Sequence, residues 1–387
     1  MNEVLSVGEI LSPERRAAYT DRKEYAGYLN ACIEDAEKYP ADDQRSQPFV
    51  FAFVNELMYE YDFGDGWMFR ITPQKDIGYD VSIKDWRLAQ IEESAAKHPE
   101  SGWSFLKGNI ADKNTIDGLF TKFHPDIVVN LAAQAGVRYS ITNPDAYIQS
   151  NLIGFYNILE ACRHNPVAHL IYASSSSVYG TNKKVPYSTE DKVDNPVSLY
   201  AATKKSNELM AHAYSKLYNI PSTGLRFFTV YGPAGRPDMA YFGFTNKLLK
   251  GETIQIFNYG NCKRDFTYID DIVEGVIRVM QGAPEKQTGE DGLPIPPYAV
   301  YNIGNQNPEN LLDFVDILQQ ELIAAGVLPA DYDFEAHKEL VPMQPGDVPV
   351  TYADTSALKR DFGFKPATPL REGLRNFARW YKAFYGI

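Results

Sequence analysis

Cysteine, long apolar runs and net positive charge are scarce in this sequence. The 387 residues include three cysteines, Cys32, Cys162 and Cys262, which lie far apart and form no C-x-x-C pair. That spacing predicts neither a disulfide framework nor a bound metal, and it favours a reducing compartment. The most apolar run near the N-terminus, residues 48–54, is too short to cross a bilayer. We therefore expect a cytoplasmic protein without a membrane partner.

The shortage of positive charge disfavours a second class of partner. Lysine and arginine number 38 against 50 acidic residues, which gives a formal net charge of −12 at pH 7. Nucleic acids and anionic membrane surfaces both favour a basic face, so neither is expected to bind. With 44% apolar side chains, a chain of this length can form an ordinary globular core.

Two regions of different character meet near residue 75. Residues 14–38 predict a helix, and residues 48–71 predict one or two strands around a turn at Asp65-Gly66. From residue 81 onward helices alternate with short apolar strands: helices at 81–97, 113–123, 143–163 and 200–218, and strands at 103–107, 126–131, 168–173 and 223–228. This alternation is typical of an α/β fold in which helices cover a parallel sheet. Further helices are predicted at 309–325 and 369–384, in a smaller C-terminal lobe.

A serine run followed by a tyrosine–lysine pair carries the clearest chemistry. Residues 174–177 are serines at the end of a predicted strand, and Tyr200 and Lys204 open a later helix. The same Tyr-x-x-x-Lys spacing, which alone is weakly specific, recurs at Tyr19/Lys23, Tyr179/Lys183 and Tyr259/Lys263. A tyrosine that acts as a base near neutral pH needs its pKa lowered by about 3 units, or roughly 4 kcal/mol. Lys204, one helical turn from Tyr200, supplies the necessary cation, and Ser175 can hydrogen-bond the same substrate hydroxyl.

With these motifs the chain resembles the extended short-chain dehydrogenases/reductases, and among them the NAD-dependent epimerase/dehydratase family. The resemblance covers about four-fifths of the chain and follows the family's order through residues 130–140, the serine run, Tyr200/Lys204, and residues 226–233, 235–239, 255–257, 263–271 and 343–347. It is greatest for UDP-glucuronate 4-epimerases. It implies a Rossmann-like sheet, NAD as cofactor and epimerisation of UDP-glucuronate through a 4-keto intermediate. It also implies a homodimer whose interface is formed by helices 143–163 and 200–218.

The resemblance assigns roles to individual residues. Ser175, Tyr200 and Lys204 form the expected catalytic set. The expected cofactor-binding residues are Asn109, Ile110, Leu131, Ala132, Ala133, Gln134, Asn151, Tyr200 and Lys204. The expected substrate-binding residues are Arg138, Ser175, Ser176, Thr229, Arg236, Gln255, Phe257, Arg264 and Asp347. Among these, Arg264 and Asp347 hold the diphosphate and ribose of UDP, residues 255–257 follow the uracil, and Thr229 with Arg236 receives the sugar carboxylate.

The N-terminal part lacks the glycine loop that the family uses to hold NAD. A Rossmann domain begins with a strand, a G-x-x-G-x-x-G turn and a helix, whose backbone N–H groups bind the pyrophosphate. The glycines before residue 80 are Gly8, Gly27, Gly64, Gly66 and Gly78, and no three of them have this spacing. The acidic residue that would bind the adenosine ribose is also absent. We therefore interpret the chain as an epimerase whose first βαβ unit has been replaced, with impaired NAD binding and a sheet that lacks its first strand.

The predicted domains are an atypical N-terminal segment (1–75), a Rossmann-like cofactor and catalytic domain (76–230, with return segments near 265–305) and a lobe that mainly binds the UDP-sugar (231–387). Two other functions stay open. A UDP-glucuronate decarboxylase would share the 4-keto intermediate, although Thr229 and residues 235–239 favour the epimerase. A catalytically degenerate UDP-sugar-binding protein is the other, and the missing glycine loop favours it.

Overall fold

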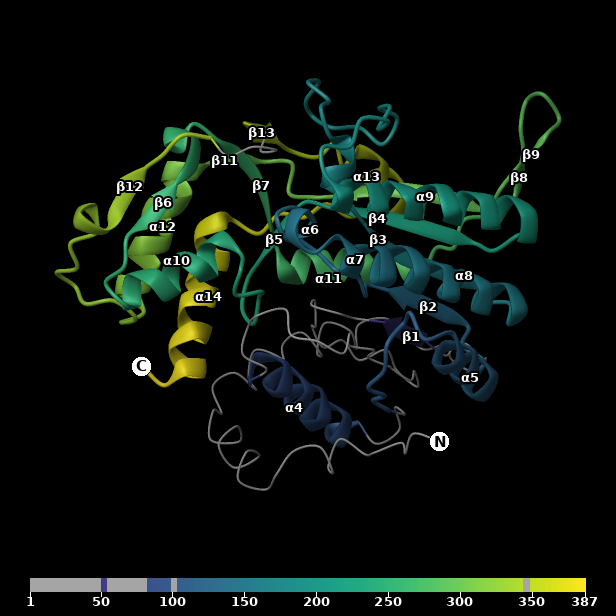
Figure 1. Ribbon diagram of the computed structural model, residues 1–387, viewed down its shortest axis with the longest axis horizontal. Coiled ribbons are helices and arrows are strands. Elements are labelled where there is room, and N and C mark those ends of the chain that lie inside the picture. The colour runs from purple at the N-terminus through teal and green to yellow at the C-terminus, as the bar shows by residue number, and fades with distance from the viewer. Residues whose placement is uncertain (1–49, 54–81, 99–102, 344–348) are drawn as a thin grey trace. The chain divides into compact units, whose positions relative to one another are not determined.

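The computed structural model describes residues 50–53, 82–98, 103–343 and 349–387 (Figure 1). The chain divides into two compact units, and neither is contiguous in sequence. The first comprises residues 1–173, 203–224 and 283–299, and the second comprises residues 174–202, 225–282 and 300–387. The predicted helix at 14–38 and the Asp65-Gly66 turn lie outside the described residues.

The first unit contains most of the helices and strands that precede residue 174. These are β1 (Val50–Phe53), α4 (Ser82–Lys97), α5 (Lys113–Phe123), β2 (Ile127–Asn130), α6 (Tyr139–Thr142), α7 (Pro144–Tyr147), η1 (Ile148–Ile153) and α8 (Gly154–His164), with the later hairpin strands β8 (Gln287–Thr288) and β9 (Pro294–Ile295). Strands β3 (His169–Ser175), β4 (Ser222–Phe227) and β10 (Tyr298–Ile303) and helix α9 (Leu199–Tyr218) have residues in both units.

A five-stranded sheet in the order β1-β2-β3-β4-β10 runs through this part of the fold. Strands β1 and β2 pair in parallel, as do β2 and β3, and all four residues of β2 are buried. A strand covered on both faces needs a continuous apolar run, which Ile-Val-Val supplies. The connection from β2 back to β3 passes through α8, as parallel strands require. The predicted α/β class with a parallel sheet is confirmed.

The sheet does not lack its first strand, contrary to our expectation. Strand β1 comes from the N-terminal segment of different character, and it pairs with β2 in the register Val50↔Ile127 to Phe53↔Asn130. The ladder is made by backbone N–H and C=O groups, so any short segment that adopts an extended backbone can form it. A strand predicted within residues 48–71 thus forms at β1, and what the sequence did not indicate is its place beside β2.

Two other local predictions differ from the structure. Residues 103–107 form no strand, although Phe105 is buried, because no partner strand for them is present in the described part of the chain. The predicted helix at 143–163 forms, but the π-helical turn η1 interrupts it between α7 and α8. Helix α5, by contrast, has the predicted bounds, since the Asp112 side chain caps its start and His124 ends it in a left-handed conformation.

The second unit is built around strand β7. Its elements are η2 (Ser176–Tyr179), β5 (Thr229–Tyr231), α10 (Ala240–Leu249), β6 (Ile254–Ile256), η3 (Phe257–Gly260), β7 (Lys263–Tyr268), α11 (Ile269–Met280), β11 (Pro308–Asn310), α12 (Leu311–Ala324), η4 (Glu335–His337), β12 (Lys338–Leu340), β13 (Val350–Thr351), α13 (Ser356–Phe362) and α14 (Leu370–Tyr385). Strand β7 pairs with β5 and β13 in parallel and with β11 antiparallel, while β6 pairs separately with β12. The helices predicted at 309–325 and 369–384 correspond to α12 and α14.

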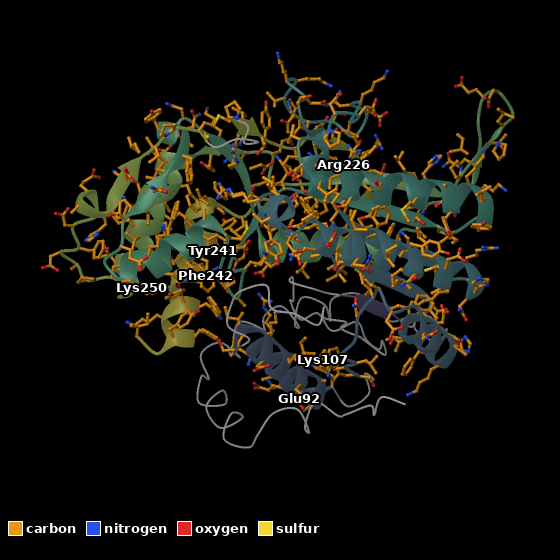
Figure 2. The ribbon with its side chains drawn as sticks, viewed as in Figure 1. Glu92, Lys107, Arg226, Tyr241, Phe242 and Lys250 are labelled. Carbon is orange, nitrogen blue, oxygen red and sulfur yellow. The ribbon has the colours of Figure 1, made fainter. Side chains whose placement is uncertain are left out.

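Aromatic rings hold α10 against α14 in this unit. Tyr241 and Phe242, labelled in Figure 2, are almost fully buried. The Tyr241 ring meets the edge of Phe377 at a centroid distance of 4.7 Å, and Phe242 lies 5.5 Å from Tyr381. Edge-to-face packing of this kind adds to the free energy gained by burying the rings. The two helices are therefore packed against each other by their buried rings.

A buried carboxylate ties β7 to two loops. Asp265 has no exposed surface, and its oxygens accept hydrogen bonds from the backbone N–H groups of Asn305 at 2.8 Å, Gln306 at 3.1 Å and Ala353 at 2.9 Å. Burial raises the pKa of this carboxyl above its usual range, while the three N–H donors act in the opposite direction. Asp265 thus joins three segments that are far apart in sequence.

Replacing Asp265 by Asn should lower the free energy of unfolding by roughly 2–4 kcal/mol, because the amide turns an NH₂ group toward backbone donors and leaves at least one of them without an acceptor. Urea unfolding followed by circular dichroism measures this change. Asp316→Asn, an exposed substitution on α12, is the control. Equal stability of the two variants would contradict the role assigned to Asp265.

Candidate active site

The serine run ends strand β3 and begins a tight turn. Ser174 and Ser175 are buried, whereas Ser176 is partly exposed. Ser175 stands immediately before η2, and its Oγ accepts a hydrogen bond from the backbone N–H of Ser177 at 3.2 Å. A serine in this position caps the turn and is held by it. The hydroxyl of Ser175 therefore has a defined position at the carboxyl end of β3, where open α/β sheets bind their ligands.

A buried polar network, which the sequence did not reveal, holds the end of this turn at Tyr179. The Tyr179 hydroxyl donates to Oδ1 of Asn302 at 2.7 Å, and Nη1 of Arg226 donates to the Tyr179 oxygen at 3.1 Å. The Tyr179 ring also stacks on Tyr187 at 4.4 Å. All four side chains are buried, and Figure 2 labels Arg226. Tyr179 therefore has a structural role of its own in this turn.

Tyr200 and Lys204 lie one turn apart on α9. Ser198 precedes the helix and accepts a hydrogen bond from the Ala201 N–H through its side chain at 3.1 Å, which explains where the helix begins. Tyr200 is partly exposed. Lys204 is only 4% exposed, and its Nζ donates to the backbone oxygen of Ala173 at 2.8 Å. The lysine is thereby held at Ala173, a residue of β3 that comes two positions before Ser175 in sequence.

Asn151, in the π-helical turn, holds the segment after β2 to helix α9. Its Oδ1 accepts from the Gln134 N–H at 2.7 Å, and its Nδ2 donates to the Gln134 oxygen at 3.0 Å and to Oγ1 of Thr203 at 3.0 Å. Its own backbone oxygen accepts from Nδ2 of Asn207 at 2.6 Å. The residue is almost fully buried, so each of these bonds replaces contact with water.

The other expected cofactor residues also belong to the first unit. Ala132 and Ala133 are buried, and Leu131 is partly exposed. Asn109 accepts the Ala111 N–H through Oδ1, and the Ile110 oxygen accepts from Asn157 at 2.9 Å. Position 154 is a glycine because the Ile110 side chain leaves no room for a larger residue: a Cβ there would lie 2.5 Å from it. Among the expected cofactor residues only Tyr200 lies in the second unit.

The expected substrate residues fall mainly in the second unit. Thr229 on β5 and Arg264 on β7 belong to neighbouring strands, and Arg264 donates to the backbone oxygens of Lys263 and Pro349. Gln255 lies on the separate strand β6 with Phe257 just after it, and Gln255 donates to Glu339 at 3.1 Å.

The remaining three residues are not on these strands. Arg236 lies in the second unit, between β5 and α10, and pairs with Asp238. Arg138 is exposed in the first unit, and Asp347 lies outside the described residues.

Neither a metal centre nor a membrane span is found in the part of the chain that the structure describes. No group of three or more His, Cys, Asp or Glu side chains there could hold a metal ion, and no helix there is long and apolar enough to cross a bilayer. The free thiols of Cys162 and Cys262 are buried, and burial raises the pKa of the Cys162 thiol.

Comparison with known proteins decides the family. Residues 74–304 match the NAD dependent epimerase/dehydratase family. The chain belongs to this family. It is 50% identical to protein CapI of Staphylococcus aureus over 313 residues, which cover 79% of this chain and 89% of CapI. It is 47% identical to UDP-glucuronate 4-epimerase 4 of Arabidopsis thaliana over 314 residues, or 79% of this chain and 68% of the relative.

Solved structures from the family agree with the fold. A UDP-glucuronic acid 4-epimerase from Bacillus cereus, in complex with UDP-glucuronic acid and NAD, matches with a TM-score of 0.68. Its sequence is 28% identical, and the match covers 83% of this chain and 92% of that one. The prediction of a Rossmann-like member of this family is therefore confirmed.

Two of the expected cofactor residues are buried and held at helix α9. Lys204 lies on this helix, and Asn151 donates to Oγ1 of Thr203 on the same helix. Residues 54–63 follow β1 in sequence but lie outside the described residues. They contain no glycine and include Glu56 and Glu60.

Asn151→Ala should lower the free energy of unfolding by about 2–4 kcal/mol, because both backbone groups of Gln134 lose a buried partner. Chemical denaturation monitored by tryptophan fluorescence measures this. The matched control is Asn165→Ala, since Asn165 bonds only to the Ala161 oxygen at the end of α8 and should cost less than about 1 kcal/mol. A loss for Asn151→Ala no larger than for the control would count against the role of Asn151.

Proposed function

We propose that the chain carries the active site of a UDP-glucuronate 4-epimerase. The observation that carries this proposal is the pairing of Tyr200 and Lys204 on α9 after the Ser175 turn, in a chain that is 47% identical to such an epimerase from Arabidopsis thaliana. The substrate is a UDP-linked hexuronic acid, and the net reaction inverts carbon 4 of the sugar.

The proposed roles follow from the chemistry of the side chains. Tyr200 takes the proton of the hydroxyl on carbon 4, and Ser175 hydrogen-bonds the same oxygen. Lys204 lies one turn from Tyr200, and its positive charge favours the phenolate over the phenol. The bond from Lys204 to the Ala173 oxygen keeps that charge in place. In this family NAD is the hydride acceptor.

The second unit supplies the proposed binding groups. Arg264 faces the diphosphate, which every UDP-sugar carries, and Asp347 the ribose, while Gln255 and Phe257 follow the uracil. Thr229 and Arg236 face the carboxylate that distinguishes a uronic acid from a neutral sugar, because a guanidinium can bind both oxygens at once. Arg138 and Ser176 are assigned to the same ligand.

A second candidate function is UDP-sugar binding without turnover. The absence of glycine in residues 54–63 favours it, since the pyrophosphate of NAD would be poorly held. In this candidate the second unit keeps its ligand, and only the supply of cofactor is impaired.

We also propose a homodimer that pairs through α8 and α9. The two helices lie side by side, because the Tyr214 hydroxyl donates to Glu160 at 2.7 Å. Ile153 at the end of η1 and Tyr156 on α8 are about two-fifths exposed, and Leu209 on α9 is 60% exposed. Apolar side chains grouped on neighbouring helices are suited to burial against a second copy.

The unpaired, buried thiols of Cys162 and Cys262 suit a reducing cytoplasmic compartment.

Two arginine variants should lose affinity in different ways. Arg264→Ala should weaken UDP, UDP-glucose and UDP-glucuronate alike, by about 1.5–3 kcal/mol for a lost charged hydrogen bond. Arg236→Ala should weaken UDP-glucuronate by a similar amount and leave UDP unchanged, because only the carboxylate loses its partner. Competition against a labelled UDP probe measures both without NAD. If Arg236→Ala lowered UDP affinity as much as UDP-glucuronate affinity, the assignment to uronic acids would fail.

NAD should bind this chain weakly. Several lost N–H bonds to pyrophosphate, at roughly 1–3 kcal/mol each, move the dissociation constant from micromolar to about millimolar or beyond. Calorimetric titration with NAD measures this, and titration of the same sample with UDP serves as the control for a folded binding site. A micromolar dissociation constant, or NAD that copurifies with the protein, would show that the N-terminal segment provides a pyrophosphate site of another kind.

A further inference from the structure

Arg236 is fixed by a second side chain of its own loop. Its Nε donates to Oδ1 of Asp238 at 2.9 Å, and its Nη2 donates to Oδ2 at 2.5 Å. Two parallel N–H···O bonds of this kind fix the plane of the guanidinium as well as its position. The Arg236 side chain is 16% exposed and that of Asp238 is 54% exposed, so the carboxylate lies on the more solvated side of the pair.

The loop that carries this pair is itself well defined. The Met239 N–H donates to the Arg236 oxygen at 3.1 Å, which closes a turn with Pro237 and Asp238 at its centre. Proline favours the second position of such a turn because its φ is already set. Gly235 is required just before the turn, because a Cβ there would collide with the Tyr241 hydroxyl. The turn therefore places the Asp238 side chain next to that of Arg236.

We propose that Asp238 is a positioning residue that sets the selectivity of Arg236 for the sugar carboxylate. The inference rests on the proposed function, in which Arg236 receives that carboxylate. Asp238 takes the edge of the guanidinium formed by Nε and Nη2. A guanidinium has a second bidentate edge, formed by Nη1 and Nη2, and the fixed plane determines where that edge points. In the proposed function the sugar carboxylate binds at that edge while Asp238 stays in place.

The pair affects selectivity for two reasons. A free arginine side chain loses rotamer entropy when a ligand orders it, and an arginine already held in one plane loses less. The Asp238 carboxylate also offsets part of the guanidinium charge. An anion attracted to Arg236 by charge alone, without directed hydrogen bonds, therefore gains little affinity. A planar carboxylate in the correct place still gains two directed hydrogen bonds, whereas the hydroxymethyl group of UDP-glucose offers a single oxygen.

The test compares binding to Asp238→Asn with binding to the wild type. Asparagine keeps the size of the side chain but offers one acceptor oxygen and no charge. UDP-glucuronate affinity should fall roughly three- to tenfold, the value of a typical hydrogen bond. UDP and UDP-glucose should change by no more than about twofold, because an exposed ion pair contributes little to the fold itself. Displacement of a labelled UDP probe measures all three ligands without NAD.

Asp361→Asn is the matched control. Arg360 makes the same two-bonded fork to Asp361, at 2.7 and 2.9 Å, at the end of α13 in the same unit. Removing that carboxylate should leave the affinities for UDP-glucuronate, UDP-glucose and UDP unchanged. Asp238→Glu, which keeps the charge one methylene further out, should lose less UDP-glucuronate affinity than Asp238→Asn and provides the comparison if the asparagine variant does not fold.

The outcomes separate this inference from the proposed function. Wild-type protein that binds UDP-glucuronate no better than UDP-glucose would contradict the proposed function itself. A wild type that prefers UDP-glucuronate, together with an Asp238→Asn variant that binds it equally well or more tightly, would overturn the role of Asp238 alone. Equal losses for UDP and UDP-glucuronate in Asp238→Asn would also overturn it, because the effect of Asp238 would then not be specific to the sugar carboxylate.

Discussion

One buried amide determines the arrangement of the first unit. Asn151 joins the segment after β2 to helix α9, and it does so from a π-helical turn that widens the backbone by one residue. If that side chain were absent, Gln134 would have two buried backbone groups without partners, and α9 would lose a fixed point beside Lys204. The expected cofactor segment and helix α9 are thus positioned by the same three side-chain bonds.

The second unit uses the same principle with a charge in place of an amide. Asp265 gathers three backbone N–H groups from two loops and holds them at β7, next to Arg264. Groups of this kind contribute little net stability when all their bonds are made, but they select one arrangement, because every alternative leaves a buried polar atom unsatisfied.

Much of the fold was predictable where local signals were strong. Helix α5 has an Asp cap and a clear apolar face, and α9 follows Ser198, so periodicity and capping give nearly the right bounds. Residues 103–107 have the apolar composition of a strand, but a strand also needs a neighbour, which composition does not report. The π-helical turn, the Tyr179–Asn302 bond and the Arg236–Asp238 fork depend on exact distances or on residues far apart in sequence. The motifs singled out Ser175, Tyr200 and Lys204, and the contacts of Ser175 and Lys204 show what holds those two side chains in place.

Strand β1 shows that strand pairing and phosphate binding, which occur together at the start of a Rossmann fold, have different requirements. A parallel ladder depends on backbone N–H and C=O groups alone, so four extended residues from a segment of different character pair with β2. A phosphate-binding turn depends instead on glycines, because side chains keep backbone N–H groups away from a pyrophosphate. A segment exchanged at a strand position can therefore restore strand pairing without restoring a ligand site, and measurements of secondary structure would not detect the difference.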